Sequence, residues 1–190
     1  MRPIFITLLA GSLSTLSGCG SLLSSMQVGT IEDQPNERTL AQLIEDDNIE
    51  TKATVNIHAE NEAYDDAHLV IVSYNGYVLL AGQVNDDVLK EEATKVVRKV
   101  LGVRRIYNEL EIGPPSSALT RSSDTWITTK IKTALLSSSD EDGSRTKIVT
   151  ENGVVYLMGL VTRDEADAIA DKAADVSSVR RVVRLFEPLD

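Results

Sequence analysis

A repeated block of residues constrains the fold of this chain more than any other feature. Residues 74–84 align with residues 151–161, and six of the eleven positions are identical, including an Asn-Gly pair and a second Gly. Farther along, residues 103–106 match residues 179–182. The two matches are offset by 77 and 76 residues, so the spacing is nearly constant. Two copies joined by a linker predict tandem domains rather than a solenoid.

Each copy contains a predicted β-hairpin. In the first copy, β-rich runs at residues 69–74 and 77–81 flank an Asn-Gly pair, and residues 147–151 and 154–158 do the same in the second. Asn-Gly favours a type I′ turn, because both central residues of that turn need positive φ. The residues that we expect at turns and strand ends, with a structural role, are Asn75, Gly76, Gly82, Asn152, Gly153 and Gly159.

Apolar residues recur with a helical period on both sides of each hairpin. Before the hairpins, the spacing predicts helices at residues 48–57 and 126–136, with Asp124 as the N-cap of the second. After them, residues 89–100 and 166–173 carry one-sided apolar stripes, and the second stripe follows a Thr162/Glu165 capping box. Alternating residues at 106–112 and 182–186 then predict a last strand in each copy.

The order α-β-β-α-β therefore occurs twice. We expect an α+β fold of two tandem domains, each with two helices and a three-stranded mixed sheet. The last strand follows a crossover helix, so it should pair parallel to one hairpin strand.

The beginning of the chain reads as a secretory signal that ends at the only cysteine. A basic start and an interrupted apolar run lead to Leu16-Ser17-Gly18-Cys19, which resembles the lipobox of bacterial lipoproteins. That resemblance implies removal of residues 1–18 and acylation of Cys19, and several acyl chains anchor a protein stably. Gly20, which is not Asp, implies the periplasmic leaflet of the outer membrane. A chance cysteine after a hydrophobic signal is the alternative.

Five segments follow from these patterns. We expect a signal peptide at residues 1–18, a lipidated flexible tether at 19–38, a first domain at 39–112, a proline-containing linker at 113–122 and a second domain at 123–188. The linker permits the two domains to pack on each other, with a helix of one covering the sheet of the other.

The repeated unit resembles a known domain family. The α-β-β-α-β order and the block N-G-x-V-x-L-x-G-x-V resemble the BON domain of bacterial envelope proteins. Together with the signal and lipobox, the whole chain resembles the dual-BON outer-membrane lipoproteins. The departure is greatest at residues 40–67, which are longer and more acidic than a minimal BON helix and strand.

Several kinds of chemistry find no support in the sequence. A net charge of −10 argues against nucleic-acid binding, which uses clustered Lys and Arg. No nucleophile elbow, phosphate-binding Gly loop or His-rich metal spacing occurs, so we expect no enzyme, cofactor or metal site. His58 and His68 are expected at the surface or in loops. The acidic runs at 45–47 and 140–142 are expected on solvated faces, with a loose cation site as the minor alternative.

The second copy is the better candidate for a membrane contact. Residues 19–120 carry 8 basic and 17 acidic residues, whereas residues 121–190 carry 10 and 12, so anionic lipid repels the second copy less. The only tryptophan, Trp126, lies at the edge of the apolar stripe of its predicted helix. From the residues alone, core packing and interfacial exposure of Trp126 are equally open.

The family resemblance implies a function for this helix. In the dual-BON lipoproteins it contacts lipid, which here points to Trp126, supported by Thr125, Ile127, Thr128, Lys130 and Lys132. The implied partner is an anionic phospholipid, phosphatidylglycerol or cardiolipin, with recruitment to sites of cell division and maintenance of outer-membrane integrity. The alternative is a periplasmic adaptor that binds envelope proteins of outer-membrane protein assembly or cell-wall remodelling, through exposed sheet edges.

Overall fold

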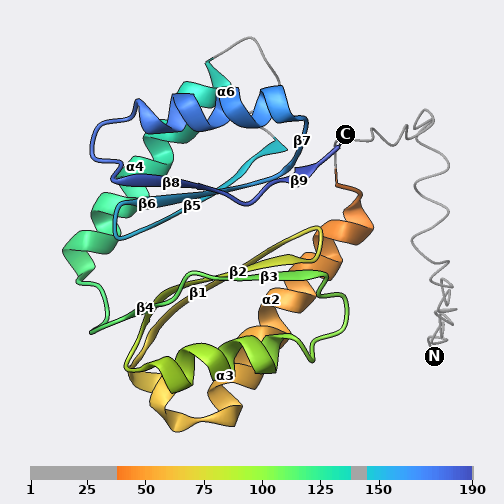
Figure 1. Ribbon diagram of the computed structural model, residues 1–190, viewed down its shortest axis with the longest axis vertical. Helices are drawn as coiled ribbons and strands as arrows, with labels where there is room; N and C mark the ends of the chain where they lie inside the picture. The colour runs from red at the N-terminus through yellow and green to blue at the C-terminus, as the bar shows by residue number, and fades with distance from the viewer. Residues whose placement is uncertain (1–37, 138–144, 190) are drawn as a thin grey trace, which may run out of the picture. The chain divides into compact units, whose positions relative to one another are not determined.

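The computed structural model describes residues 38–137 and 145–189 (Figure 1). The expected signal peptide, Cys19, Gly20, the tether up to residue 37 and the acidic run at 140–142 lie outside the described residues. Within the described part of the chain, every helix is too short or too polar to cross a membrane.

The expected order of elements is present in both copies, which confirms the α+β fold with two tandem domains. The first domain contains α2 (Leu40–Glu60), the 3-10 helix η1 (Glu62–Asp66), β1 (His68–Tyr74), β2 (Tyr77–Val84), α3 (Asp87–Val97), β3 (Arg105–Asn108) and β4 (Glu111–Ile112). The second contains α4 (Ala118–Leu136), β5 (Lys147–Glu151), β6 (Val154–Met158), β7 (Leu160–Val161), α6 (Arg163–Ala174), β8 (Arg181–Arg184) and β9 (Glu187–Pro188). The element η1 is an addition that the sequence patterns did not indicate.

Both hairpins close through the expected Asn-Gly turns. Asn75 and Gly76 have φ of 50° and 74°, and Asn152 and Gly153 have φ of 49° and 73°. All four values are positive, as a type I′ turn requires. The last strand of each domain pairs parallel to the second hairpin strand, β3 with β2 and β8 with β6, as expected.

The last strand is interrupted in both domains, whereas the sequence indicated a continuous one. In the first domain β3 and β4 both pair with β2, and between them the Asn108 Oδ1 atom accepts a hydrogen bond from the Leu110 N–H. Leu110 is thereby turned into the core. Ile112, expected on the same face as Leu110, is exposed instead, and so is its neighbour Glu111 in β4.

The first helix of each domain begins earlier than expected. Helix α2 begins at Leu40 behind a Thr39/Gln42 capping box, and α4 begins at Ala118 behind the N-cap Ser117. Asp124 is therefore not an N-cap, and the expected linker at 113–122 already contains the first turn of α4. Ile49, Ala53 and Ile57 form the buried stripe of α2, and Ile127, Ile131 and Leu135 form that of α4.

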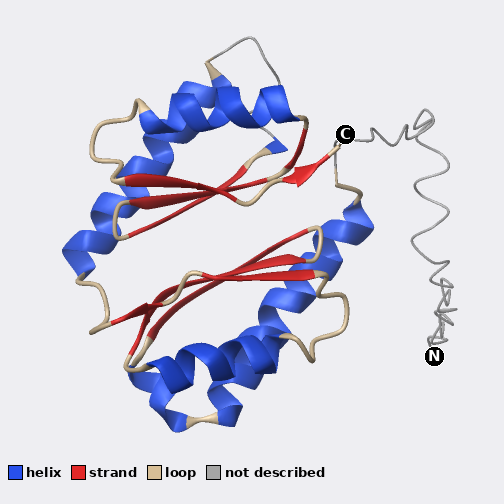
Figure 2. Cartoon of the chain, in the orientation of Figure 1, coloured by secondary structure: helices blue, strands red, loops and turns tan. Residues whose placement is uncertain are grey.

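Each sheet has its own pair of helices on one face (Figure 2). Helices α2 and α3 cover the β1-β2-β3 sheet through one apolar cluster, and α4 and α6 cover the β5-β6-β8 sheet through another.

A third apolar cluster joins the opposite faces of the two sheets. It contains Val72, Tyr74, Leu79 and Ala81 from the first domain and Val149, Val154, Tyr156, Met158, Leu160 and Leu185 from the second. The domains thus pack sheet on sheet. The linker also permitted a helix of one domain to cover the sheet of the other, but each sheet is apolar on both faces and the two sheets pack on each other instead.

Candidate functional site

Trp126 lies on the solvent-facing side of α4, which resolves the two alternatives that the sequence left open. Its side chain is 49% exposed, so it is not part of the core. The Lys130 Nζ atom lies 3.7 Å from the centre of the Trp126 ring, one helical turn farther along. An ammonium group over an indole face is a favourable cation–π contact. The pair places a cation and a large amphipathic ring at one spot on the surface.

A shallow groove of 510 Å³ runs beside this pair. Its walls come from α4 and from the segment after α6, which contributes Val176. On α4 the lining residues follow a helical period, and they are Trp126, Thr129, Lys130, Thr133, Ala134 and Ser137. Asp175 also lines the groove, so its rim carries one carboxylate beside the Lys130 ammonium group. The groove has a mixed apolar and hydroxyl lining, which suits an amphipathic ligand.

The structure brings together only two of the six residues expected at this site. Ile127 is 1% exposed and packs in the core, so its expected role at the surface is corrected. Thr128 is half-buried, and its hydroxyl donates to the Thr150 Oγ1 atom at 2.7 Å. Thr125 and Lys132 are exposed, but at about 100° per residue they lie about 100° and 120° around the helix from Trp126.

Residues that the sequence analysis missed share the face of Trp126. Thr129 and Thr133 lie three and seven positions after it, and Leu119 lies seven positions before it and is 82% exposed. Their i, i+3, i+7 spacing would have identified them if the predicted helix had begun at Ala118. The exposed face of α4 therefore extends over its whole length.

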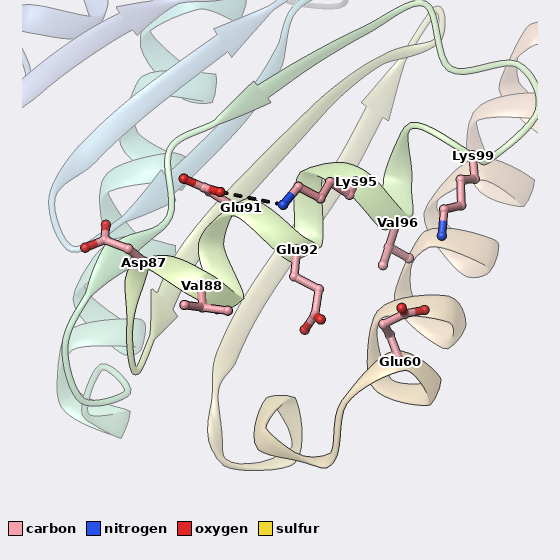
Figure 3. Close-up of a pocket in the computed structure, with 8 residues that line it drawn as sticks. All are labelled: Glu60, Asp87, Val88, Glu91, Glu92, Lys95, Val96 and Lys99. Carbon is pink, nitrogen blue, oxygen red and sulfur yellow. Dashed lines mark ion pairs between the residues drawn. The ribbon is translucent and has the colours of Figure 1, made fainter.

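A second depression, of 270 Å³, lies beside α3 (Figure 3). Four carboxylates and two lysines line it, and Glu91 and Lys95 form an exposed i,i+4 ion pair at 3.6 Å. In the described ranges no cluster of His, Cys, Asp and Glu residues has a metal-binding arrangement. The mixed charges of this face resemble an ordinary solvated helix surface.

The acidic run at residues 45–47 contains one carboxylate that is not solvated, which corrects the expectation for Asp46. Asp46 is buried, and its oxygens accept from the backbone N–H groups of Asn75 and Gly76 at 2.8 and 2.9 Å. The Ser73 hydroxyl and Arg38 also donate to it. Burial alone would raise the pKa of Asp46, but these hydrogen bonds outweigh it and hold the pKa below its ordinary value.

Asp124 has the same role in the second domain. It is buried in the middle of α4, and it accepts from the N–H groups of Asn152 and Gly153 at 2.8 Å each. Both acidic residues thus tie the first helix of a domain to its hairpin turn.

The two histidines have different surroundings. His58 is exposed and lies 3.1 Å from Asp65, as expected for a surface residue. His68 instead lies in β1, and its Nε2 atom is 3.3 Å from the buried Glu151 carboxylate of the second domain. Gln83 also donates to Glu151, at 3.0 Å. His68 is therefore a domain-interface residue and not a loop residue.

The architecture matches a known protein family in both halves. The model described as "BON domain" matches residues 45–114 and 123–187. The chain belongs to the BON-domain family. Trp126 and Lys130 lie within the second BON match, whereas Leu119 and the first turn of α4 precede it.

Relatives of this BON-domain chain extend over most of its length. It is 32% identical over 185 residues to the outer membrane lipoprotein DolP of Haemophilus influenzae, which covers 97% of this chain and 96% of the relative. It is 34% identical to the 21 kDa hemolysin of Actinobacillus pleuropneumoniae over 78% of this chain and 77% of that one. It is 25% identical to the osmotically-inducible protein Y of Escherichia coli over 92% of both chains. The tandem arrangement resembles DolP as a whole, not in one domain only.

Proposed function

We propose that the protein is a non-enzymatic, lipid-anchored BON-domain protein that binds anionic phospholipid through the exposed face of α4. Its relationship to an outer membrane lipoprotein supports association with the outer membrane. Acylation of Cys19, placement in the periplasmic leaflet, support of membrane integrity and recruitment to division sites are parts of the same proposal. The proposed function includes no catalysis, because the sequence contains no catalytic motif that we recognise.

One observation carries the lipid-binding proposal, the exposure of Trp126 beside Lys130. A half-exposed indole is costly for a surface that meets only water, and Trp prefers the interface between lipid headgroups and acyl chains. The Lys130 ammonium group over the ring would then meet the phosphates at the same depth. The exposed Leu119 on the same face adds apolar area toward the beginning of the helix.

The distribution of charge also supports a lipid contact by the second BON domain. The chain up to residue 120 carries a net charge of −9 after the expected signal cleavage, and residues 121–190 carry −2. An anionic surface attracts basic residues and repels acidic ones over about a Debye length. The second BON domain is therefore the one that can approach such a surface at low electrostatic cost.

Vesicle co-sedimentation tests the proposal. A soluble form that lacks residues 1–19 should bind phosphatidylglycerol vesicles and bind phosphatidylcholine vesicles more weakly. Trp126→Glu should reduce binding about 10-fold or more, because it replaces an interfacial anchor with a charge that the lipid repels. The matched control is Asn48→Glu, which adds the same charge at the equivalent exposed position of α2. Equal binding by the Trp126→Glu variant and the unaltered protein would refute the proposal.

The two lysines give a finer test of which face contacts lipid. Lys130→Gln should weaken binding more than Lys132→Gln, because Lys130 lies over the Trp126 ring and Lys132 lies on another side of the helix. A larger loss for Lys132→Gln would place the contact on a different face of α4.

A further inference from the structure

Each BON domain has a polar pocket at its hairpin turn, and the two pockets are built from equivalent residues. In both, the buried Asp of the first helix accepts from the turn, the turn Asn presents its side chain, and an Arg ahead of the last strand lies beside it. The equivalent pairs are Asp46 and Asp124, Asn75 and Asn152, and Arg104 and Arg180. The arginines are also held alike, since Nη1 of each donates to the carbonyl oxygen of the Asn, at 3.1 Å for Arg104 and 3.0 Å for Arg180.

A carboxylate from the second domain binds the Asn75 and Arg104 side chains at the first turn. Glu187, in β9, accepts from both terminal nitrogens of Arg104, at 2.9 and 2.5 Å. The Asn75 Nδ2 atom donates to the same carboxylate at 2.6 Å. A forked pair with an added amide donor is the geometry in which an Arg recognises a carboxylate most strongly. The Asn-Arg corner therefore functions as a carboxylate receptor within this molecule.

The equivalent corner of the second domain has the same donors without this partner. Among the described residues, no carboxylate contacts Arg180, and the Asn152 side-chain amide makes no hydrogen bond. Arg180 is exposed, yet its bond to the Asn152 carbonyl oxygen already orients the guanidinium group. The Arg180 side chain therefore loses less conformational entropy when a ligand binds than a freely moving arginine would.

Two differences between the pockets make the second more open to an anion. The first pocket contains the Glu45 carboxylate, and the equivalent residue of the second is Ser123, which has no charge. The second pocket is also larger, 320 Å³ against 140 Å³. A carboxylate that binds Arg180 would therefore lie beside no acidic neighbour equivalent to Glu45, and the pocket next to it is larger.

We propose that Arg180 and Asn152 form a binding site for an acidic side chain, a Glu or Asp carried on an extended segment of a partner protein. The precedent is Glu187, a glutamate on a short strand that occupies the equivalent corner. The site goes beyond the phospholipid proposal. On α4 its pocket is lined by residues between Leu119 and Ile127, and Leu119 also belongs to the Trp126 face, whereas the Trp126 groove is lined by residues from Trp126 onward.

A peptide with the sequence of residues 185–189, Leu-Phe-Glu-Pro-Leu, is the probe, because its glutamate already fits the equivalent corner. The full chain in detergent micelles is titrated with the labelled peptide by fluorescence anisotropy. NMR shifts of the Asn152 side-chain amide locate the site. The peptide with Gln in place of Glu should bind at least about 10-fold more weakly, since it loses the charge-assisted bonds.

The variant Arg180→Gln should weaken binding by a similar factor. Arg181→Gln removes the same charge one residue farther along and should change the affinity less than about 2-fold. Binding that survives Arg180→Gln, or that does not distinguish the Glu peptide from the Gln peptide, would overturn the proposal.

A second variant separates loss of binding from loss of fold. Ser123→Glu introduces the carboxylate that the first domain carries at this position, so it should fold normally and weaken peptide binding by added repulsion. Its thermal unfolding serves as the check. A parallel titration with glycerol phosphate tests the other source of an anion. If glycerol phosphate shifts the Asn152 amide and the peptide does not, the site belongs to a lipid headgroup and the proposal is wrong.

Discussion

In each domain one carboxylate holds the hairpin turn against the first helix. It is Asp46 in the first domain and Asp124 in the second. The expectation that Asp124 is the N-cap of α4 was wrong. A carboxylate can act as an N-cap or as an anchor for a turn, because it accepts hydrogen bonds from backbone N–H groups in both roles. The two roles differ in whether those N–H groups belong to the helix or to the turn. Since Ser117 already caps α4, the Asp124 oxygens are available for Asn152 and Gly153.

Replacing each Asp by Asn should therefore destabilise the protein by unequal amounts. The amide retains one acceptor oxygen and leaves one turn N–H without a partner, so Asp124→Asn should lower the free energy of unfolding by about 1–2 kcal/mol. Asp46 also accepts from Ser73 and Arg38, so Asp46→Asn should cost about 2–4 kcal/mol. Urea denaturation of both variants measures the difference. Equal losses would mean that the two additional partners of Asp46 contribute nothing.

The pKa of Asp46 predicts a dependence on pH. A carboxyl group whose pKa is lowered by folding stabilises the protein above its ordinary pKa of about 3.9, and that stability is lost as the pH falls through the lowered value. The advantage of the unaltered protein over Asp46→Asn should thus be constant at neutral pH and shrink below about pH 4. Denaturation at a series of acidic pH values tests this. An advantage that does not change in acid would contradict it.

At the level of elements, the hairpins could be predicted almost to the residue and the helix starts could not. Asn75-Gly76 and Asn152-Gly153 carry a local rule, positive φ at two successive positions, that no tertiary contact has to supply. The start of α4 instead depends on Ser117, one of several serines in an unpatterned stretch, and its exposed first turns carry no apolar stripe. The break at Asn108 depends on a side-chain bond to Leu110, which has no local signal.

Gly82 shows how strongly a strand position can depend on the absence of a side chain. It has φ of 108° within β2, and an added Cβ would lie 1.9 Å from the His68 carbonyl oxygen. Gly82→Ala should therefore destabilise the protein by roughly 3 kcal/mol or more, since both the backbone conformation and the contact are unfavourable. Gly113→Ala is the control, because no atom lies within 4 Å of its added Cβ, and it should stay within about 0.5 kcal/mol. Thermal unfolding distinguishes the two, and a similar loss for both would refute the argument.

At the scale of the whole molecule, the two sheets share one apolar cluster that joins the two domains. The signal was present in the sequence, because β2 and β6 are almost continuous apolar runs rather than alternating ones. Such runs are typical of strands buried on both faces. What residue patterns could not supply is the partner of the second face. Glu151 pairs with His68, which is 83 positions away in the sequence, and with Gln83, which is 68 positions away.

A charge placed between the sheets should therefore separate the domains. Ala81 is fully buried in the shared cluster, and Ala81→Asp should cost about 3 kcal/mol or more and increase the radius of gyration in small-angle scattering. The control Val88→Asp adds the same charge at an exposed position of α3 and should leave both quantities nearly unchanged. An unaltered radius for Ala81→Asp, with a single unfolding transition, would show that the shared core tolerates the charge.

The shared core also imposes an order on biosynthesis. The strands β1 and β2 precede every strand of the second domain in the chain. Their apolar residues Val72, Tyr74, Leu79 and Ala81 are buried only when the second domain packs on them. The carboxylate that joins Arg104 comes 83 residues later in the chain. Without the second domain, the first sheet would expose this apolar face to water, and such a surface aggregates or recruits chaperones. We therefore expect a fragment that ends between the two domains to be less soluble than the full chain.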